Sequence, residues 1–212
     1  MEELKTVRDH ITVELIEKKS RFIADLYRVN KEEEAQQIIK QIKKQYYDAR
    51  HHCFAYQIKQ NEGDILRFSD DGEPSGTAGA PILNIITKNN LKNVLVIVTR
   101  FFGGILLGAG GLVRAYSGAA QRAIEQAQII EEQEGYEIKT IIAYSELEKF
   151  KYYCKINQIQ VTNIEYLDNC WITTEMSLKE YDKIIAKTQE LPFEIIQNTI
   201  IRKKYVEKNT RK

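Results

Sequence analysis

The sequence predicts an α+β protein of two domains, and three observations support this class. Its 212 residues, 43% hydrophobic and 29% charged, have the composition of a globular chain that buries a core. Apolar runs typical of strands alternate with segments of helical period. Nine of the eleven glycines lie between Gly72 and Gly118, whereas none follows Gly135, so the two halves differ in their backbone requirements. We therefore predict domains over residues 1–134 and 135–205 and a basic tail over 206–212.

The first domain should contain four strands, a long helix, a short helix, a buried strand and a last helix. The apolar patterns place the four strands at residues 11–17, 21–29, 53–59 and 64–69, with Asn61-Glu62-Gly63 as a hairpin turn. A helix over 31–47 has an apolar stripe and Asn30 as its expected N-cap. Pro81 suits the first turn of a helix that runs to residue 88, because its missing N–H would be unpaired there. The buried strand 94–98 leads through glycines into a helix over about 112–130.

The second domain has the element order βαββαβ. Its apolar runs are at 137–143, 159–167, 170–176 and 193–201, and its helical segments are at 146–157 and 178–190. Each helix opens with an S-x-x-E capping box, Ser145 with Glu148 and Ser177 with Glu180. The repeated pattern predicts a duplicated βαβ unit, which is the ferredoxin-like sandwich.

Charge and cysteine content exclude several classes of protein. A net charge of +1 is too small for the protein as a whole to attract nucleic acid, so any such attraction must come from a local basic patch. The tail from Arg202 to Lys212 carries six basic residues and one acid, and it could either touch a phosphate backbone or lie solvated. Three cysteines at wide spacing form neither a disulfide framework nor a zinc pair. The sequence has no apolar stretch long enough for a membrane span and no pattern of a secretory signal at its N-terminus, so we expect a cytoplasmic chain without a membrane partner. We also expect no metal and no cofactor.

A glycine-rich segment between Arg100 and Arg114 is the first candidate site. Its glycines, which permit positive φ and close approach of another group to the backbone, are Gly103, Gly104, Gly108, Gly110 and Gly111. An anion could bind at the following helix start, and the two arginines could close on it. Ala109 stands where a Walker loop needs lysine, and Val113 stands where a dinucleotide fingerprint needs a small residue.

A polar loop over residues 69–81 is the second candidate. Asp70, Asp71 and Glu73 could together hold Mg²⁺ or serve as acid and base; alternatively, the two aspartates make turns and Glu73-Pro74 shapes the next bend. His51-His52-Cys53 cannot converge on one ion, because neighbouring strand residues point to opposite faces.

Four motifs together resemble one known family. They are Lys19-Ser20-Arg21-Phe22, His52-Cys53-Phe54-Ala55, the stretch from Asp70-Asp71-Gly72-Glu73-Pro74-Ser75-Gly76-Thr77 to Pro81, and the stretch from Arg100 to Tyr116. The chain is similar to the IMPACT family in its bacterial YigZ-type form. The resemblance implies a first domain like the second domain of ribosomal protein S-five and a ferredoxin-like second domain like the last domain of elongation factor G. Both comparisons point to the translation machinery.

The function we expect is therefore non-enzymatic and linked to translation. Through the glycine-rich segment the chain would bind RNA, the ribosome or a translation-associated protein, with Arg100 and Arg114 meeting phosphate or carboxylate. Ser75 and Thr77 would add hydrogen bonds from the facing loop. The alternative is a Mg²⁺-dependent enzyme that acts on a phosphorylated small molecule or nucleotide, with Asp70, Asp71 and Glu73 as ion ligands. A third possibility is a pure protein adaptor.

Overall fold

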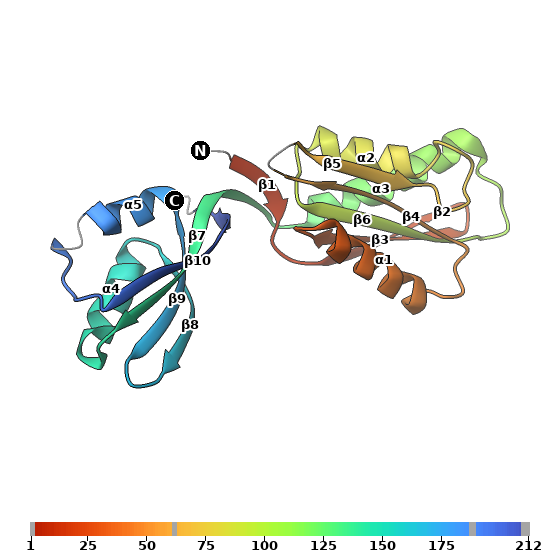
Figure 1. Ribbon diagram of the computed structural model, residues 1–212. Coiled ribbons are helices and arrows are strands. Elements are labelled where there is room, and N and C mark those ends of the chain that lie inside the picture. Colours follow the sequence, from red (N-terminus) through yellow and green to blue (C-terminus); the bar gives the residue numbers. More distant parts are fainter. Residues whose placement is uncertain (1–2, 61–62, 187–189, 209–212) are drawn as a thin grey trace. The chain divides into compact units, whose positions relative to one another are not determined.

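The computed structural model describes residues 3–60, 63–186 and 190–208, which form two compact units (Figure 1). The first unit runs over Lys5–Ile130, and the second consists of the chain from Glu131 onward together with Glu3 and Leu4. Each unit combines a β-sheet with helices, so the predicted two-domain α+β class is confirmed. The predicted turn at Asn61-Glu62 lies outside the described residues.

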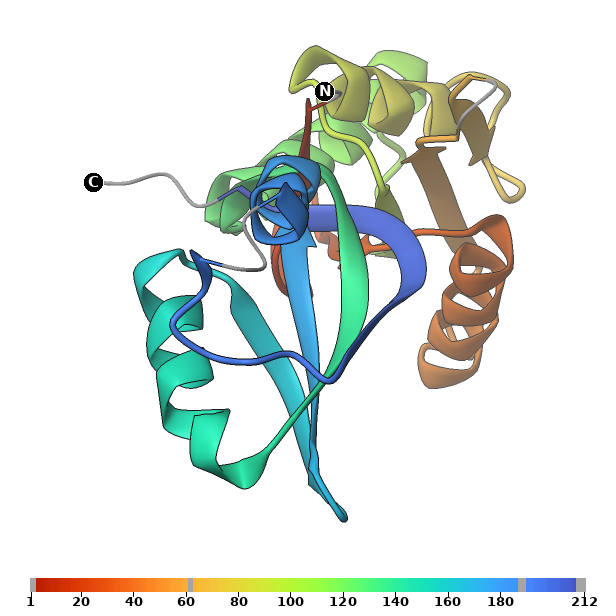
Figure 2. The same cartoon turned by 60° about the vertical axis from the view of Figure 1, so that its left-hand side comes forward.

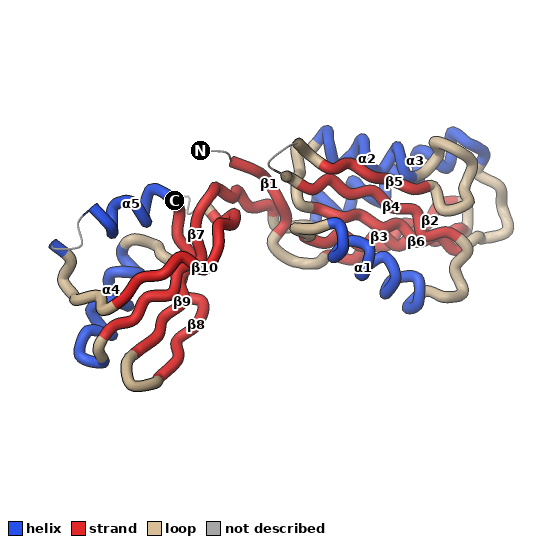
Figure 3. Tube along the Cα trace, in the orientation of Figure 1, coloured by secondary structure: helices blue, strands red, loops and turns tan. Residues whose placement is uncertain are grey.

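The first unit is built on an antiparallel sheet with the strand order β2-β3-β6-β4-β5 (Figure 3). Its strands are β2 (Ile11–Glu17), β3 (Ser20–Arg28), β4 (His51–Ile58), β5 (Ile65–Ser69) and β6 (Val94–Phe101). The strand β6 lies at the centre and is buried along almost its whole length. A strand that is covered on both faces needs apolar residues at successive positions, which explains the continuous apolar run in its sequence.

Helices cover both faces of this sheet, α1 (Glu32–Gln45) on one face and α2 (Gly79–Lys88) with α3 (Gly108–Gln126) on the other (Figure 1). Alternate residues of β6 enter different cores. Val96 and Val98 pack with the residues of α2 and α3, whereas Leu95 and Ile97 pack with those of α1. The sheet is therefore the middle layer of three.

Two helix starts differ from the predictions. The helix α3 begins at Gly108, four residues before the predicted start near Leu112, so Gly110 and Gly111 belong to its first turn and not to a loop. Glycine is a poor helix former, and the propensity rule therefore placed the start too late. The helix α1 has Lys31 at its N-cap, and the backbone N–H of Asn30 donates to Glu34 Oε2 at 2.8 Å.

The second unit has the predicted order βαββαβ. Its elements are β7 (Ile129–Ile142), α4 (Leu147–Ile156), β8 (Gln160–Tyr166), β9 (Cys170–Ser177), α5 (Leu178–Ala186) and β10 (Gln197–Glu207). The sheet has the order β1-β7-β9-β8, where β1 is Glu3–Val7, and β10 pairs with β7. Phe150 and Cys154 of α4 and Ile184 of α5 pack with Ile138 and Ile172 of the sheet. The two helices cover one face of this sheet (Figure 2). This arrangement is the expected ferredoxin-like sandwich.

Local features of the second unit confirm one predicted capping box and correct the other. The hydroxyl of Ser177 accepts the N–H of Glu180 at 3.2 Å, as predicted, but Ser145 lies in a 3₁₀ turn (Tyr144–Glu146), and α4 starts after Glu146 without a side-chain cap. Gly135 lies inside β7, where an added Cβ would be 2.3 Å from the carbonyl oxygen of Met176. Close packing of strands therefore requires this glycine. Among the described residues, no helix is long and apolar enough to cross a membrane.

Candidate functional site

The loop over residues 70–78, here called the motif loop, connects β5 to α2 and is held first by Asp70. The Oδ1 atom of Asp70 accepts the N–H groups of Ala78 and Gly79 at 3.0 and 2.8 Å, and Oδ2 accepts that of Gly76 at 2.9 Å. Burial alone would raise the pKa of this carboxyl, but the three backbone donors outweigh burial and lower the pKa. Asp70 therefore caps the start of α2 as a carboxylate.

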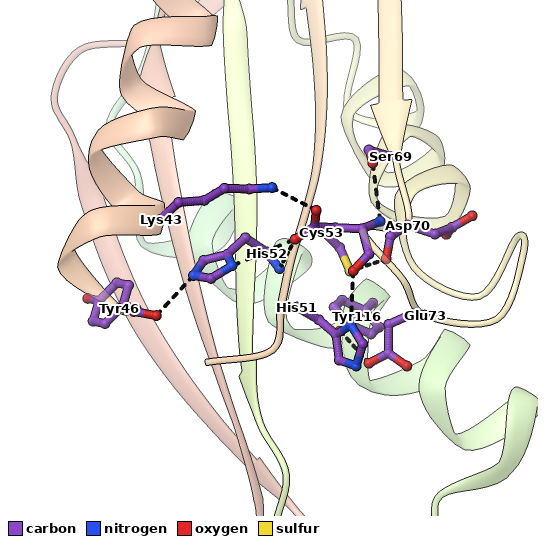
Figure 4. A network of polar contacts seen from close by, with 10 residues as sticks. Lys43, Tyr46, His51, His52, Cys53, Ser69, Asp70, Glu73 and Tyr116 are labelled. Atoms are coloured by element: carbon purple, nitrogen blue, oxygen red, sulfur yellow. Dashed lines mark hydrogen bonds and ion pairs between the residues drawn. The ribbon is translucent and has the colours of Figure 1, made fainter. Parts of the chain in front are cut away.

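Asp71 joins the motif loop to α1 and β4. Its Oδ1 atom accepts the ammonium of Lys43 at 2.7 Å, and its Oδ2 atom accepts the backbone N–H of His52 at 2.7 Å (Figure 4). Burial opposes ionisation, but these two donors prevail and lower the pKa of Asp71. The residue has a φ of +41°, a left-handed conformation that Asp tolerates better than most residues.

Glu73 joins the motif loop to β6 and α3. Its Oε1 atom accepts the guanidinium of Arg100 at 2.7 Å and the hydroxyl of Tyr116 at 2.8 Å, and all three side chains are buried. Burial, with the nearby Glu73 carboxylate, raises the pKa of Tyr116, so this hydroxyl remains a donor. The Arg100 guanidinium also lies 5.6 Å from the ring centre of Phe22 and 5.5 Å from that of Phe102.

This geometry corrects the role expected for Arg100. Its side chain is 8% exposed and forms an internal ion pair, so it positions Glu73 and does not face an external phosphate. The strand pattern contained a signal for this placement, because Arg100 has the same parity as Val96 and Val98, which point into the core.

The three carboxylates of the motif loop have separate partners. Asp70 binds backbone N–H groups at the start of α2, Asp71 binds Lys43, and Glu73 binds Arg100. Their donors leave no common point at which the three oxygens could meet one Mg²⁺ ion without breaking these contacts. In the part of the chain that the structure describes, no group of three or more His, Cys, Asp or Glu side chains is placed to hold a metal.

The two hydroxyls of the motif loop point in different directions. The hydroxyl of Thr77 donates to the carbonyl oxygen of Pro74 at 2.6 Å and is buried, so it stabilises the loop internally. Ser75 is exposed between Pro74 and Gly76. Gly72 packs against the ring of His51, whose Nδ1 atom lies 2.9 Å from the carbonyl oxygen of Asp71. Of the two hydroxyls, those of Ser75 and Thr77, only that of Ser75 is placed to meet a ligand.

The glycine-rich segment is anchored at both ends. A Cβ on Gly103 would lie 2.0 Å from the carbonyl carbon of Lys19, and the N–H of Gly103 donates to the hydroxyl of Ser20 at 3.2 Å. Gly103 is thus required for close packing on the β2–β3 turn. At the other end the side chain of Leu107 is buried. Between these anchors Gly104 has a φ of +84° and open space around it.

Arg114 lies close to the first turn of α3. The helix has no side-chain cap at Leu107, and its first N–H groups have no intrahelical acceptor and no side-chain acceptor among the described residues. Arg114 is exposed, and its Nη1 atom is 3.7 Å from the position of a Cβ on Gly110. The guanidinium therefore reaches back to the helix start, at the positive end of the dipole.

The structure adds residues that the sequence analysis had not assigned to the candidate site. Lys18 and Lys19 form the exposed β2–β3 turn that contacts Gly103. Ile105 and Leu106 project from the glycine-rich segment and are exposed. The apolar run between Gly104 and Gly108 was the available signal, since such residues in a loop with polar surroundings are typical of a contact surface.

The four described basic residues between Arg202 and Lys208 are paired with carboxylates of the second unit. Arg202 Nε lies 2.5 Å from Glu137 Oε2, and Lys204 Nζ lies 2.6 Å from Glu175 Oε1. Val206 belongs to β10, whereas residues 209–212 lie outside the described residues. Because the acidic neighbours offset these charges, this part of the chain presents no strong positive field to a phosphate backbone.

Fold and site together define the class: an α+β protein in which an acidic loop is tethered to its neighbours and a glycine-rich segment starts the helix α3. The Impact N-terminal domain family matches residues 18–124, and the Domain of unknown function (DUF1949) matches residues 140–191. The chain belongs to the IMPACT family, as the four motifs had indicated.

Individual relatives agree with this assignment. The IMPACT family member YvyE of Bacillus subtilis is 41% identical over 175 residues, which are 82% of this chain and 80% of the relative. The IMPACT family member YigZ of Escherichia coli is 43% identical over 110 residues, 51% of this chain and 54% of the relative. A crystal structure described as that of a hypothetical protein matches 92% of this chain and 97% of its own with 29% identity and a TM-score of 0.63.

Proposed function

We propose that this IMPACT family member acts in translation without catalysis, by binding the ribosome through ribosomal RNA or through a ribosomal or ribosome-bound protein. The contact is made by what we call the glycine loop surface, which consists of Lys18, Lys19, residues 102–110, Val113 and Arg114. One observation carries the proposal: an uncapped helix start is exposed, and an exposed arginine reaches back to it.

The electrostatics of this arrangement favour an anionic ligand. A cation beside a helix N-terminus is unfavourable by about 0.3–1 kcal/mol, because the dipole there is positive. Among the described residues, no carboxylate forms an ion pair with Arg114 that would relieve this repulsion, and Arg100 is already neutralised by Glu73. A phosphate or carboxylate bound between Arg114 and the first N–H groups of α3 would convert the repulsion into attraction.

Sedimentation of the full chain with purified bacterial ribosomes tests the proposal. The variant Arg114→Gln should bind about tenfold more weakly, since a hydrogen bond to a charged group contributes about 1.5–3 kcal/mol. If the lost contact is to phosphate, the slope of log affinity against log salt should fall by about one.

A matched control is available on the same helix. Arg122 is exposed two turns further along α3, so Arg122→Gln removes the same charge away from the helix start. The control should bind like the natural chain. Equal binding by the two variants, or no sedimentation of the natural chain with ribosomes at any salt concentration, would contradict the proposed function.

A further inference from the structure

The glycine loop surface carries four exposed apolar side chains, and we call this group the loop tip. Leu106 is 82% exposed and Phe102 is 55% exposed, and Ile105 and Val113 are exposed as well. Three of the four lie within residues 102–106 of one loop, and several exposed apolar residues in one short segment are typical of protein interaction sites.

We infer that the partner of the glycine loop surface is a protein with an apolar pocket and an acidic rim, into which the loop tip inserts. This inference rests on the proposed function and names the partner class of the same surface. An RNA partner is the other outcome of the test below.

The chemistry of the loop tip favours protein over RNA. Single-stranded RNA is recognised by stacking of bases on aromatic rings and by hydrogen bonds, and the aliphatic side chains of Leu106 and Ile105 can do neither. The ring of Phe102 could stack, but the guanidinium of Arg100 already lies 5.5 Å from its centre. Burial in an apolar pocket is the interaction that stabilises aliphatic groups.

The charges around the loop tip supply the second part of the inference. Lys18, Lys19 and Arg114 are exposed cations around the glycine-rich segment. The adjoining strand β2 has two exposed acids; Glu14 is offset by Arg21, whose Nε atom lies 3.7 Å from Glu14 Oε2, which leaves Glu17 beside the turn. Three cations against one acid fit a partner whose pocket is bordered by carboxylates. The same small excess would neutralise only a few phosphates, so it gives weak affinity for a nucleic-acid backbone.

The loop tip is also held ready for insertion. The packing of Gly103 on Lys19 fixes one end of the segment, and the buried side chain of Leu107 fixes the other. A segment that is already ordered loses little conformational entropy on binding, so most of the apolar contact would appear as affinity.

A photocrosslinking experiment with purified bacterial ribosomes tests the inference. A photoreactive benzophenone amino acid is placed at position 106 of the full chain, and the products are divided between ribonuclease and protease treatment. We expect an adduct that survives ribonuclease and contains a ribosomal or ribosome-bound protein, with Asp or Glu near the crosslinked apolar residue.

Affinity measurements complete the test. Leu106→Ser should weaken ribosome binding by about ten- to hundredfold, the loss for a leucine side chain that leaves an apolar pocket, without a change in salt slope. The control Leu167→Ser alters an exposed leucine in the turn between β8 and β9 and should bind normally.

The possible failures can be distinguished. An adduct that ribonuclease destroys, an adduct between two copies of this chain, or binding of Leu106→Ser within twofold of the natural chain would overturn the inference. If Arg114→Gln still weakens binding in that case, the proposed function stands. If the natural chain itself does not bind ribosomes, both fail.

Discussion

Replacing Arg100 by methionine should destabilise the first unit strongly, although the residue lies beside an exposed surface. The guanidinium and the Glu73 carboxylate are 2.7 Å apart, with side chains 8% and 4% exposed. Removal of one partner from a buried ion pair costs about 3–5 kcal/mol, because the other charge stays buried. Tyr116 still donates to Glu73 at 2.8 Å, so we expect the lower end, about 3 kcal/mol.

The assay must follow the first unit separately, since two units need not unfold together. Cys53 lies in β4, and burial raises the pKa of its thiol to about 12, so it should react with an alkylating reagent only after the unit opens. Peptide mass spectrometry separates it from Cys154 and Cys170. The single tryptophan, Trp171, lies in β9 and reports the second unit.

In a urea titration with this labelling, half of the Cys53 thiols should become reactive at a lower urea concentration in Arg100→Met than in the natural chain. The urea midpoint of Trp171 fluorescence should be the same in both. The control Arg122→Met, on the exposed side of α3, should stay within about 0.5 kcal/mol. The double variant Arg100→Met/Glu73→Gln should cost less than the sum of its single variants. A cost below about 1 kcal/mol for Arg100→Met would refute the argument from buried charge.

Three further predictions concern backbone packing, pH and the second unit. Gly103→Ala should lower the free energy of unfolding by about 3 kcal/mol, because the added Cβ would lie 2.0 Å from backbone atoms of Lys19. The control Gly104→Ala has open space around its Cβ and strains only the positive φ, so it should cost about 1 kcal/mol. Equal costs for the two variants in thermal melts would contradict this prediction. Because the pKa of Asp70 is lower in the folded state than its ordinary value near 4, its ionised carboxylate stabilises the fold above about pH 4, and this contribution is lost as the pH falls through the folded-state pKa. In Asp70→Asn the urea midpoint of unfolding should therefore depend less on pH below about pH 4. A pH dependence equal to that of the natural chain would contradict this prediction. Arg202→Gln and Lys204→Gln should each cost at most about 1 kcal/mol and leave ribosome sedimentation unaltered, and weaker sedimentation would restore a role for these cations.

Strand positions were predictable because burial leaves a direct trace in the sequence. The strand β2 runs over Ile11–Glu17, the range that alternation predicted, and β6 contains the whole apolar run 94–98. The partner of Arg100 was not predictable in the same way. Glu73 lies 27 residues earlier, in a loop whose path follows from hydrogen bonds of Asp70 and Asp71 and not from any periodicity.

Helix starts were the other part that sequence rules described poorly. Ser145 satisfies the capping-box pattern, yet the chain enters a 3₁₀ turn there. Four residues between Leu107 and Leu112 look like a flexible loop by composition, but they are helical in the fold, where packing of Gly111 on Leu107 overrides intrinsic propensity. Composition therefore marked the glycine-rich segment as a candidate, but which of its side chains are exposed and which are buried followed only from the structure.

The motif loop makes contact with both helical layers of the first unit, through Lys43 of α1 and Tyr116 of α3. At its exposed turn, Ser75 offers a position for a small fluorescent label after exchange to cysteine. Because the label would sit on a segment tethered to both layers, its rotational mobility should increase when either helix detaches. Such a molecule would report early loosening of the unit before global unfolding.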